Sequence, residues 1–163
     1  MGTFAVQIAK AIGAEVTGVC SGSNADMVES IGADHVIDYT TDDFTRGEQR
    51  YDLIFDTVGN RSLSECRRVL TPTGVYGAAG GGSGRWLGPV VPQLKAVALS
   101  PFVSQRLVAV NDKPNRDLGF LNELIESGQI TPVIDRTYPS SEAPEAMRYL
   151  EEGHARGKIV ITV

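Results

Sequence analysis

Small polar residues and glycines follow three short apolar segments, and these residue types suit the binding of a ligand. They come after residues 15–20, 52–56 and 75–79. In that order they are Ser21, Ser23 and Asn24; Thr57, Val58 and Gly59; and Gly80 and Gly81. Loops at the carboxyl ends of parallel strands line the crevice that receives a ligand. Hydroxyls and amides there offer hydrogen bonds. The glycines either let a ligand approach closely or simply add flexibility, and both interpretations stay open.

Residues that break or form bonds do not gather into a recognisable catalytic set. There is no Ser/His/Asp pattern, no pair of carboxylates with an evident role and no CxxC motif. Cys20 and Cys66 lie in apolar patterns, which predicts two core residues rather than a disulfide. His35 and His154 have no Cys or His partner at ligand spacing, so no metal site is predicted. The candidate residues therefore predict a binding site, and no catalytic set is predicted.

The elements that position these loops alternate between helical and strand periods along the chain. Expected helices cover residues 3–13, 24–32, 61–70, 114–128 and 140–152, with a short one over 93–99; expected strands cover 15–20, 35–39, 52–56, 75–79, 106–110, 133–138 and 159–163. Ser62 and Glu65 are spaced as a capping box. Short strands alternating with helices predict an α/β fold, doubly wound, with a mostly parallel sheet covered on both faces. Neither a repeat nor a linker appears, so residues 1–163 are expected to form one domain.

Composition narrows the class of protein. The chain has 163 residues, of which 42% are hydrophobic and 21% charged, enough to build a core. Fifteen Lys and Arg against twenty Asp and Glu give a net charge of −5, which argues against a nucleic-acid partner. No apolar run reaches the ~18 residues of a membrane span, and the start lacks the pattern of a secretory signal. A cytoplasmic protein without a membrane or nucleic-acid partner is expected.

In their order and amino-acid sequence, these segments resemble the cofactor domain of the medium-chain dehydrogenase/reductase superfamily, in its quinone oxidoreductase-like branch. The resemblance covers nearly the whole chain. The segments that carry it are GTFAVQIAKAIGAEVTGVCS, GADHVIDYT, YDLIFDTVGN, KPNRDLGFLNELIESG, TPVIDRTYP and GHARGKIVITV. This resemblance implies a Rossmann-like fold and an NADPH-dependent oxidoreductase that reduces a quinone or an enone-like small molecule.

The resemblance places the cofactor on the loops described above. Gly2 matches the last glycine of the family's glycine-rich turn, at the start of a helix that suits a phosphate. The alternative is that Gly2 has no role. Ser21, Ser23 and Asn24 stand at the ribose end, where the absence of an acid at the end of strand 15–20 permits NADP. Tyr39 matches a tyrosine near the adenosine phosphate.

The family usually has a Lys or Arg beside that phosphate, and Ser23 and Asn24 stand there instead, so weaker NADP binding is expected. The alternative is that residues 21–24 only cap a helix. The resemblance places Thr57, Val58 and Gly59 beside the nicotinamide-side ribose, with Gly80 and Gly81 at the same edge.

Parts of the family pattern are absent from this sequence. We expect a chain truncated at the N-terminus, without the family's first strand, its earlier glycines or its N-terminal catalytic domain. Residues 159–163 are then expected either to fill the vacant slot in the sheet or to pair with another subunit. The resemblance also implies a homodimer through strand 133–138.

Three functions stay open. The first is an NADP-dependent reductase that acts alone or with a separate catalytic domain. The second is a non-catalytic nucleotide-binding or dimerisation module. The third is another doubly wound protein, such as a methyltransferase-like fold. This last alternative is the least favoured, because the segments VIDYT, FDTVGN and GKIVITV resemble dehydrogenase sequences.

Overall fold

The computed structural model describes residues 1–79, 104–110, 117–153 and 155–163. Gly80, Gly81 and the expected helix 93–99 lie outside these ranges. The chain divides into two compact units: the first combines Met1–Asp42 with Asn115–Val163, and the second is Asp43–Pro114. That the chain forms a single domain stays a prediction.

The N-terminal part of the first unit is a parallel strand pair with helices. Helix α1 (Gly2–Ala11) is followed by β1 (Thr17–Cys20), a 3-10 turn η1 (Gly22–Asn24), α2 (Ala25–Ser30) and β2 (His35–Asp38). The two strands pair in parallel from the start of each to its end. Helix α2 contacts both strands. The helices end before glycines with positive φ, as the sequence predicts.

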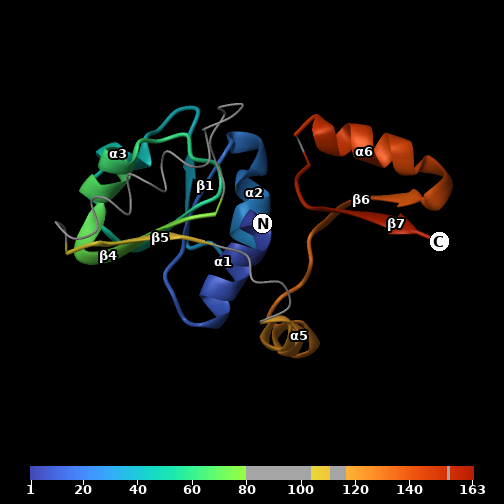
Figure 1. The fold of residues 1–163 in the computed structure, drawn as a ribbon, viewed down its shortest axis with the longest axis horizontal. Coiled ribbons are helices and arrows are strands. Elements are labelled where there is room, and N and C mark those ends of the chain that lie inside the picture. The colour runs from blue at the N-terminus through green and yellow to red at the C-terminus, as the bar shows by residue number, and fades with distance from the viewer. Residues whose placement is uncertain (80–103, 111–116, 154) are drawn as a thin grey trace. The chain divides into compact units, whose positions relative to one another are not determined.

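The C-terminal part of the first unit repeats this arrangement. Helix α5 (Leu118–Glu126) precedes β6 (Ile134–Pro139), η4 (Ser140–Glu142), α6 (Ala143–Glu151) and β7 (Lys158–Thr162). Strands β6 and β7 pair in parallel, and α6 lies along them (Figure 1). The expectation that residues 159–163 fill the vacant slot in the sheet is wrong for the described structure, because β7 lies in a separate two-stranded sheet with β6. The alternative, that these residues pair with another subunit, stays a prediction. β7 pairs with β6, the strand to which α6 connects it by a short crossover.

Gln7 ties these two parts of the first unit together. Gln7 is a buried residue of α1. Its Nε2 donates to the carbonyls of Thr3 and Thr131, both at 3.0 Å. Its Oε1 accepts from the backbone N–H of Thr131 at 2.8 Å. The Gln7 amide therefore forms hydrogen bonds with both main-chain polar groups of Thr131, just before β6, and these bonds hold that segment against α1.

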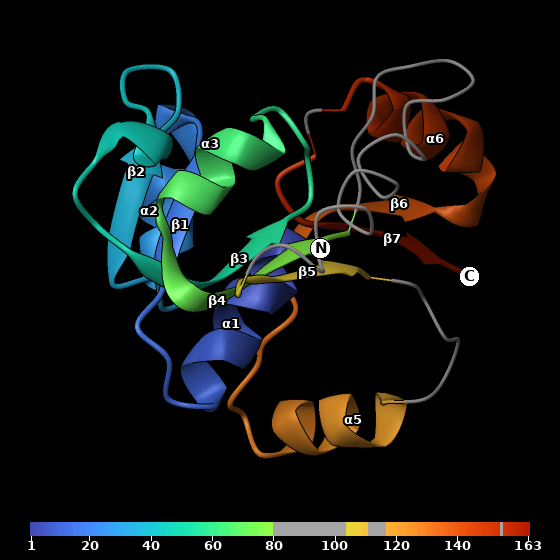
Figure 2. The same cartoon turned by 60° about the vertical axis from the view of Figure 1, so that its left-hand side comes forward.

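The described part of the second unit is a three-stranded parallel sheet with helix α3 (Leu63–Arg68) on one face. It contains η2 (Phe44–Arg46), β3 (Tyr51–Asp56), α3, β4 (Leu70–Ala78) and β5 (Arg106–Ala109), in the sheet order β3-β4-β5 (Figure 2). The proline and glycine of residues 71–74 predict a turn, but these residues are instead part of β4. The pairing register between β3 and β4 shifts there. A Cβ atom at position 74 would come within 3.1 Å of the Tyr51 carbonyl oxygen, so glycine suits this position.

The two faces of this sheet differ. On one face Cys66, Leu70 and Tyr76 form a buried cluster with their neighbours. On the other face, which the alternation along β3 and β5 defines, Leu53 is 60% exposed, Phe55 41% and Val108 39%. The second unit thus has an apolar sheet face that α3 does not cover.

All described strand pairs are parallel, which confirms the predicted α/β class. The described strands fall into three separate sheets, in which β1 is bonded to β2 and β3 to β4. Among the described residues, no helix combines the length and apolar composition that crossing a membrane requires.

Candidate functional site

The turn after β1 gathers small polar side chains. Ser21 Oγ and Ser23 Oγ lie 3.1 Å apart, and the Asn24 amide Nδ2 donates to Ser21 Oγ at 3.2 Å. The backbone N–H of Asn24 also donates to the Ser21 carbonyl at 2.8 Å. Asn24 Oδ1 is buried and has no partner among the described residues. The predicted cap is absent, because no side chain of this turn bonds the first N–H groups of α2.

A carboxylate reaches this turn from the neighbouring strand. Asp38 ends β2 opposite Cys20, the last residue of β1. Its Oδ1 accepts from the Thr40 N–H at 2.9 Å and the Thr40 hydroxyl at 2.7 Å. A Cβ at Gly22 would come within 2.5 Å of Oδ2. The turn therefore lies directly against an acid, which the sequence of strand 15–20 alone does not reveal.

Hydrogen bonds keep Asp38 ionised. The bonds from the Thr40 backbone and side chain hold the pKa of Asp38 below its ordinary value, against the opposing effect of partial burial. Burial, and next the Asp38 charge, raise the pKa of the neighbouring Cys20 thiol. Tyr39 follows Asp38, is 47% exposed, and donates its backbone N–H to the Cys20 carbonyl at 3.0 Å. The structure thus brings Tyr39 next to the turn that carries Ser21.

Gly2 begins α1 rather than preceding it. The Met1 carbonyl accepts from the N–H groups of Phe4 and Ala5 at 3.1 and 3.2 Å, so the helix is closed from its first turn. Lys158 Nζ lies 5.4 Å from the centre of the Phe4 ring, which adds a positive charge to that first turn. The sequence alone does not indicate that Lys158 lies here.

In the second unit, Asp56 shapes the loop of Thr57, Val58 and Gly59. Asp56 Oδ1 accepts from the backbone N–H groups of Val58 at 3.0 Å and Gly59 at 2.7 Å. Its Oδ2 accepts from the Tyr76 hydroxyl at 2.8 Å. Burial, and next this bond, raise the pKa of Tyr76 well above its ordinary range. The glycine at position 59 is needed because its φ is +72°.

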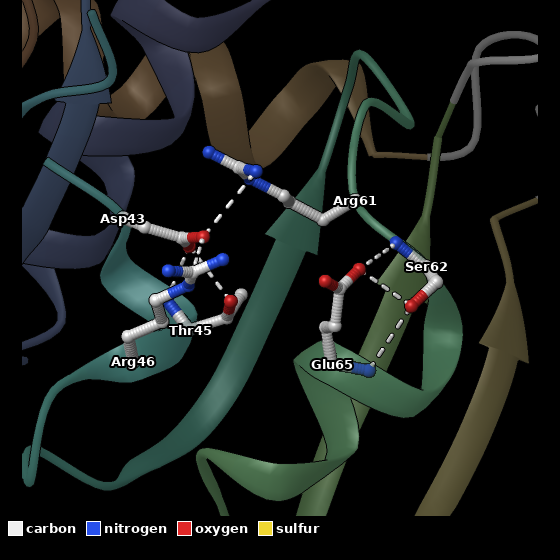
Figure 3. Close-up of polar contacts among 6 residues, drawn as sticks. All are labelled: Asp43, Thr45, Arg46, Arg61, Ser62 and Glu65. Atoms are coloured by element: carbon white, nitrogen blue, oxygen red, sulfur yellow. Dashed lines mark hydrogen bonds and ion pairs between the residues drawn. The ribbon is translucent and has the colours of Figure 1, made fainter. Parts of the chain in front are cut away.

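The far end of this loop is anchored by a second carboxylate. Asp43 accepts from the Thr45 N–H at 3.0 Å and the Thr45 hydroxyl at 2.7 Å, and these bonds lower its pKa. Arg61 and Arg46 each place a guanidinium nitrogen 3.3 Å from Asp43 (Figure 3). Arg61 follows the 57–59 loop closely, so Asp43 ties the loop to η2.

The helix after this loop starts with the predicted capping box. The Ser62 backbone N–H and hydroxyl donate to Glu65 Oε2 at 2.9 and 2.6 Å, and Ser62 Oγ accepts from the Glu65 N–H (Figure 3). The bonds from the Ser62 side chain and then its backbone lower the pKa of Glu65. Asp56 at one end and this box at the other give the loop a defined conformation.

The second unit also contains a cavity of about 520 Å³, next to η2 and α3. It is lined by Arg46, Arg50 and Arg68 together with Glu65. Arg50 donates to the carbonyls of residues 47–49, and so stabilises the segment before β3. None of the predicted site residues lines this cavity.

The predicted site residues thus fall on both units. Gly2, Ser21, Ser23, Asn24 and Tyr39 belong to the first unit, and Thr57, Val58 and Gly59 to the second. In the part of the chain that the structure describes, no group of three or more His, Cys, Asp or Glu side chains is placed to hold a metal ion.

Parallel strands joined by helices, with polar turns at their carboxyl ends, define a Rossmann-like nucleotide-binding class of fold. The model of the zinc-binding dehydrogenase family matches residues 31–161. The chain belongs to this family, and the resemblance to medium-chain dehydrogenases and quinone oxidoreductases is confirmed. The described residues do not offer the ligand set that the family name suggests, and no step is assigned to zinc.

Similar proteins are oxidoreductases by name. The chain is 33% identical to the mitochondrial NAD(P)H oxidoreductase RTN4IP1 of Mus musculus, over 100% of this chain and 45% of that protein. It is 30% identical to a chloroplast envelope quinone oxidoreductase homolog of Arabidopsis thaliana, over 99% and 49%. The solved quinone oxidoreductase of Coxiella burnetii matches with a TM-score of 0.78 and 26% identity, over 98% and 48%. The chain spans about half the length of these relatives.

Proposed function

We propose that this chain is the cofactor-binding half of a nicotinamide-dependent oxidoreductase of the quinone oxidoreductase/alcohol dehydrogenase lineage. When bound, the cofactor supplies a hydride, and the acceptor is a quinone or an enone-like small molecule. The observation that carries this proposal is the polar turn of Ser21, Ser23 and Asn24 at the carboxyl end of β1. It is supported by relatives named as NAD(P)H and quinone oxidoreductases.

The described residues fit such a cofactor. The buried, unpartnered Asn24 Oδ1 is an acceptor in need of a donor, and the turn around it is rich in hydroxyls. In this proposal Ser21, Ser23, Asn24 and Tyr39 hold the adenosine ribose. The start of α1 at Gly2, with Lys158 close by, attracts the pyrophosphate.

The remaining candidate residues would hold the nicotinamide end. Thr57, Val58 and Gly59 form a loop whose backbone Asp56 fixes, and Gly80 and Gly81 are proposed for the same edge. Prediction of NADP(H) as the cofactor rests on the resemblance and on the lack of an acid at the end of β1. The Asp38 carboxylate, which reaches the turn from β2, argues against a phosphorylated ribose.

Assembly and location are further parts of this proposal. Strand β6 carries Ile134, which is 56% exposed, and its edge away from β7 is unpaired among the described residues. A homodimer through residues 133–138 is therefore proposed, with a continuous sheet across the two-fold axis. The cytoplasmic location stays a prediction.

Binding is tested by titrating the full-length protein against NADH and NADPH and following the fluorescence of the reduced nicotinamide. Gly22→Ala is the informative variant, because its Cβ meets a carboxylate that Thr40 holds in place. Gly119→Ala is the matched control, since a Cβ there has nothing within 4 Å. We expect weaker binding from the first change alone. Absence of binding by the unaltered protein refutes the proposal.

A second candidate function is a non-catalytic nucleotide-binding or dimerisation module. The chain spans 45% and 49% of the length of the two curated relatives compared above. Adding a soluble quinone to the protein with bound NADPH separates the two functions. Oxidation of NADPH supports the reductase, and binding without oxidation supports the module.

A further inference from the structure

The arginine-lined cavity of the second unit has no part in the proposed function. Its volume is about 520 Å³, and the charged residues that line it are Arg46, Arg50, Glu65 and Arg68. Pockets that hold small ligands have volumes of roughly 300–1,000 Å³. The cavity is therefore large enough for a small organic molecule.

The cavity lies at the end of the sheet opposite to the loop proposed for the nicotinamide. Arg50 directly precedes β3, and Val69, which also lines the cavity, directly precedes β4. The two strands are parallel, so both residues mark amino ends. The loop of Thr57, Val58 and Gly59 instead follows the carboxyl end of β3. A molecule in the cavity would thus occupy a second site.

The charges around the cavity favour an anion. Three guanidinium groups and one carboxylate leave an excess of two positive charges, in a chain whose net charge is −5. Asp43 does not cancel this excess, because Arg46 shares its carboxylate with Arg61, each at 3.3 Å (Figure 3). A concave surface lined by one sign of charge attracts ligands of the opposite sign.

Two of these guanidinium groups have N–H donors to offer. Arg50 Nη1 donates to the carbonyls of residues 47–49 at 3.3, 2.8 and 3.0 Å, and these bonds hold the side chain in place. Its Nε and Nη2 have no acceptor among the described residues. The exposed Arg68 side chain, in the last turn of α3, likewise has no bond to a described residue. Such planar N–H pairs bind phosphate and carboxylate groups in a bidentate manner.

The size and charge of the cavity distinguish between anions. A phosphate monoester carries close to two negative charges at neutral pH, which matches the excess better than a single carboxylate does. Inorganic phosphate alone would leave much of the volume empty. The described lining residues include no aromatic ring on which a nucleobase would stack. These features favour a phosphate on a small, polar organic body.

Glu65 adds an acceptor for that body. Its Oε2 accepts from the Ser62 backbone N–H at 2.9 Å and from the Ser62 hydroxyl at 2.6 Å, whereas Oε1 has no bond to a described residue. An ionised carboxylate accepts hydrogen bonds from hydroxyl groups. A ligand with hydroxyls next to its phosphate would therefore satisfy both kinds of lining residue.

We propose that this cavity binds a small phosphate monoester that carries hydroxyl groups, of the sugar phosphate class. Arg50 and Arg68 bind the phosphate, and Glu65 accepts from a hydroxyl. The inference goes beyond the proposed function and does not depend on it, because none of these residues belongs to the loops assigned to the cofactor.

The test is isothermal titration calorimetry of the full-length protein with glucose 6-phosphate, inorganic phosphate and glucose. We expect glucose 6-phosphate to bind about tenfold more tightly than inorganic phosphate, because its hydroxyls add hydrogen bonds to a charged group. Glucose alone should give no measurable binding. Added salt should weaken the binding of glucose 6-phosphate, because it screens the arginine charges.

Three substitutions locate the site. Arg68→Gln should weaken the binding of glucose 6-phosphate about tenfold, and Arg68→Lys should weaken it less, because it keeps the charge without the planar fork. Arg148→Gln is the matched control, since Arg148 is also an exposed arginine in the last turn of a helix, α6. This control should change the affinity by less than about twofold.

The outcomes decide the proposal without reference to the cofactor site. Equal affinities for inorganic phosphate and glucose 6-phosphate would mean an adventitious ion only and overturn it, as would no binding of glucose 6-phosphate. Equal effects of Arg68→Gln and Arg148→Gln overturn the location. Displacement of glucose 6-phosphate by NADH would place it in the cofactor site and overturn the location too. Binding that persists with excess NADH and weakens only in the Arg68 variants supports the proposal.

Discussion

Replacing Gln7 by leucine tests whether a single buried amide joins the two parts of the first unit. The change removes the bonds at 3.0 and 2.8 Å to the carbonyl and N–H of Thr131 and leaves both groups without their partner. Each such bond contributes about 1 kcal/mol net, and an unsatisfied main-chain group adds to the loss. Because Thr131 is an exposed residue, water compensates in part. We expect the free energy of unfolding to fall by about 2–3 kcal/mol.

The assay is urea unfolding of the full-length protein, followed by far-ultraviolet circular dichroism. Gln129→Leu is the matched control, because Gln129 is exposed and, among the described residues, its side chain bonds only the nearby Ser127 hydroxyl. The control should change stability by less than about 0.5 kcal/mol. Equal effects of the two substitutions would show that the Gln7 bonds to Thr131 do not hold the unit together.

Three further predictions concern local interactions. Tyr76→Phe should lower stability in urea by about 1–2 kcal/mol, because the Asp56 carboxylate loses its bond from a buried hydroxyl; no change would mean that water replaces the hydroxyl. The Cys66 thiol, whose pKa burial raises to about 11, should react with a thiol reagent at pH 8 only after unfolding, and rapid labelling of the native protein would contradict its burial. Five carboxyls have pKa values lowered chiefly by hydrogen bonds: Asp34, Asp38, Asp43, Glu65 and Asp135. Their contribution is present above the unfolded pKa of about 4 and disappears as the pH falls through the lower folded values. The urea midpoint should thus be steady near neutral pH and drop below about pH 4, and a midpoint that rises on acidification would reverse the sign.

The fold class could be read from the sequence because its signals are local. Apolar spacing along residues 3–13 and alternating segments such as 52–56 mark helices and strands without knowledge of their partners. The capping box of Ser62 and Glu65 was predictable for the same reason, since both residues lie within one turn. Residues 71–74 read as a turn because their polar and glycine content is local too, although they extend β4 across a register slip.

Features that depend on pairing between distant strands were beyond sequence reasoning. Asp38 meets the turn after β1 only because Cys20 and Asp38 are partners in a parallel register. The loop at 57–59 looked like a glycine turn, but its conformation is fixed by Asp56, which also binds Tyr76 on the next strand. Similarly, nothing near residues 159–163 indicates that their partner is β6.

The sheet face of the second unit that α3 does not cover has a practical consequence for handling this protein. On that face Leu53 is 60% exposed, Phe55 41% and Val108 39%. Apolar side chains that gather on an exposed surface favour self-association. Samples at the concentrations that crystallisation or NMR spectroscopy requires should therefore be checked for aggregation by light scattering.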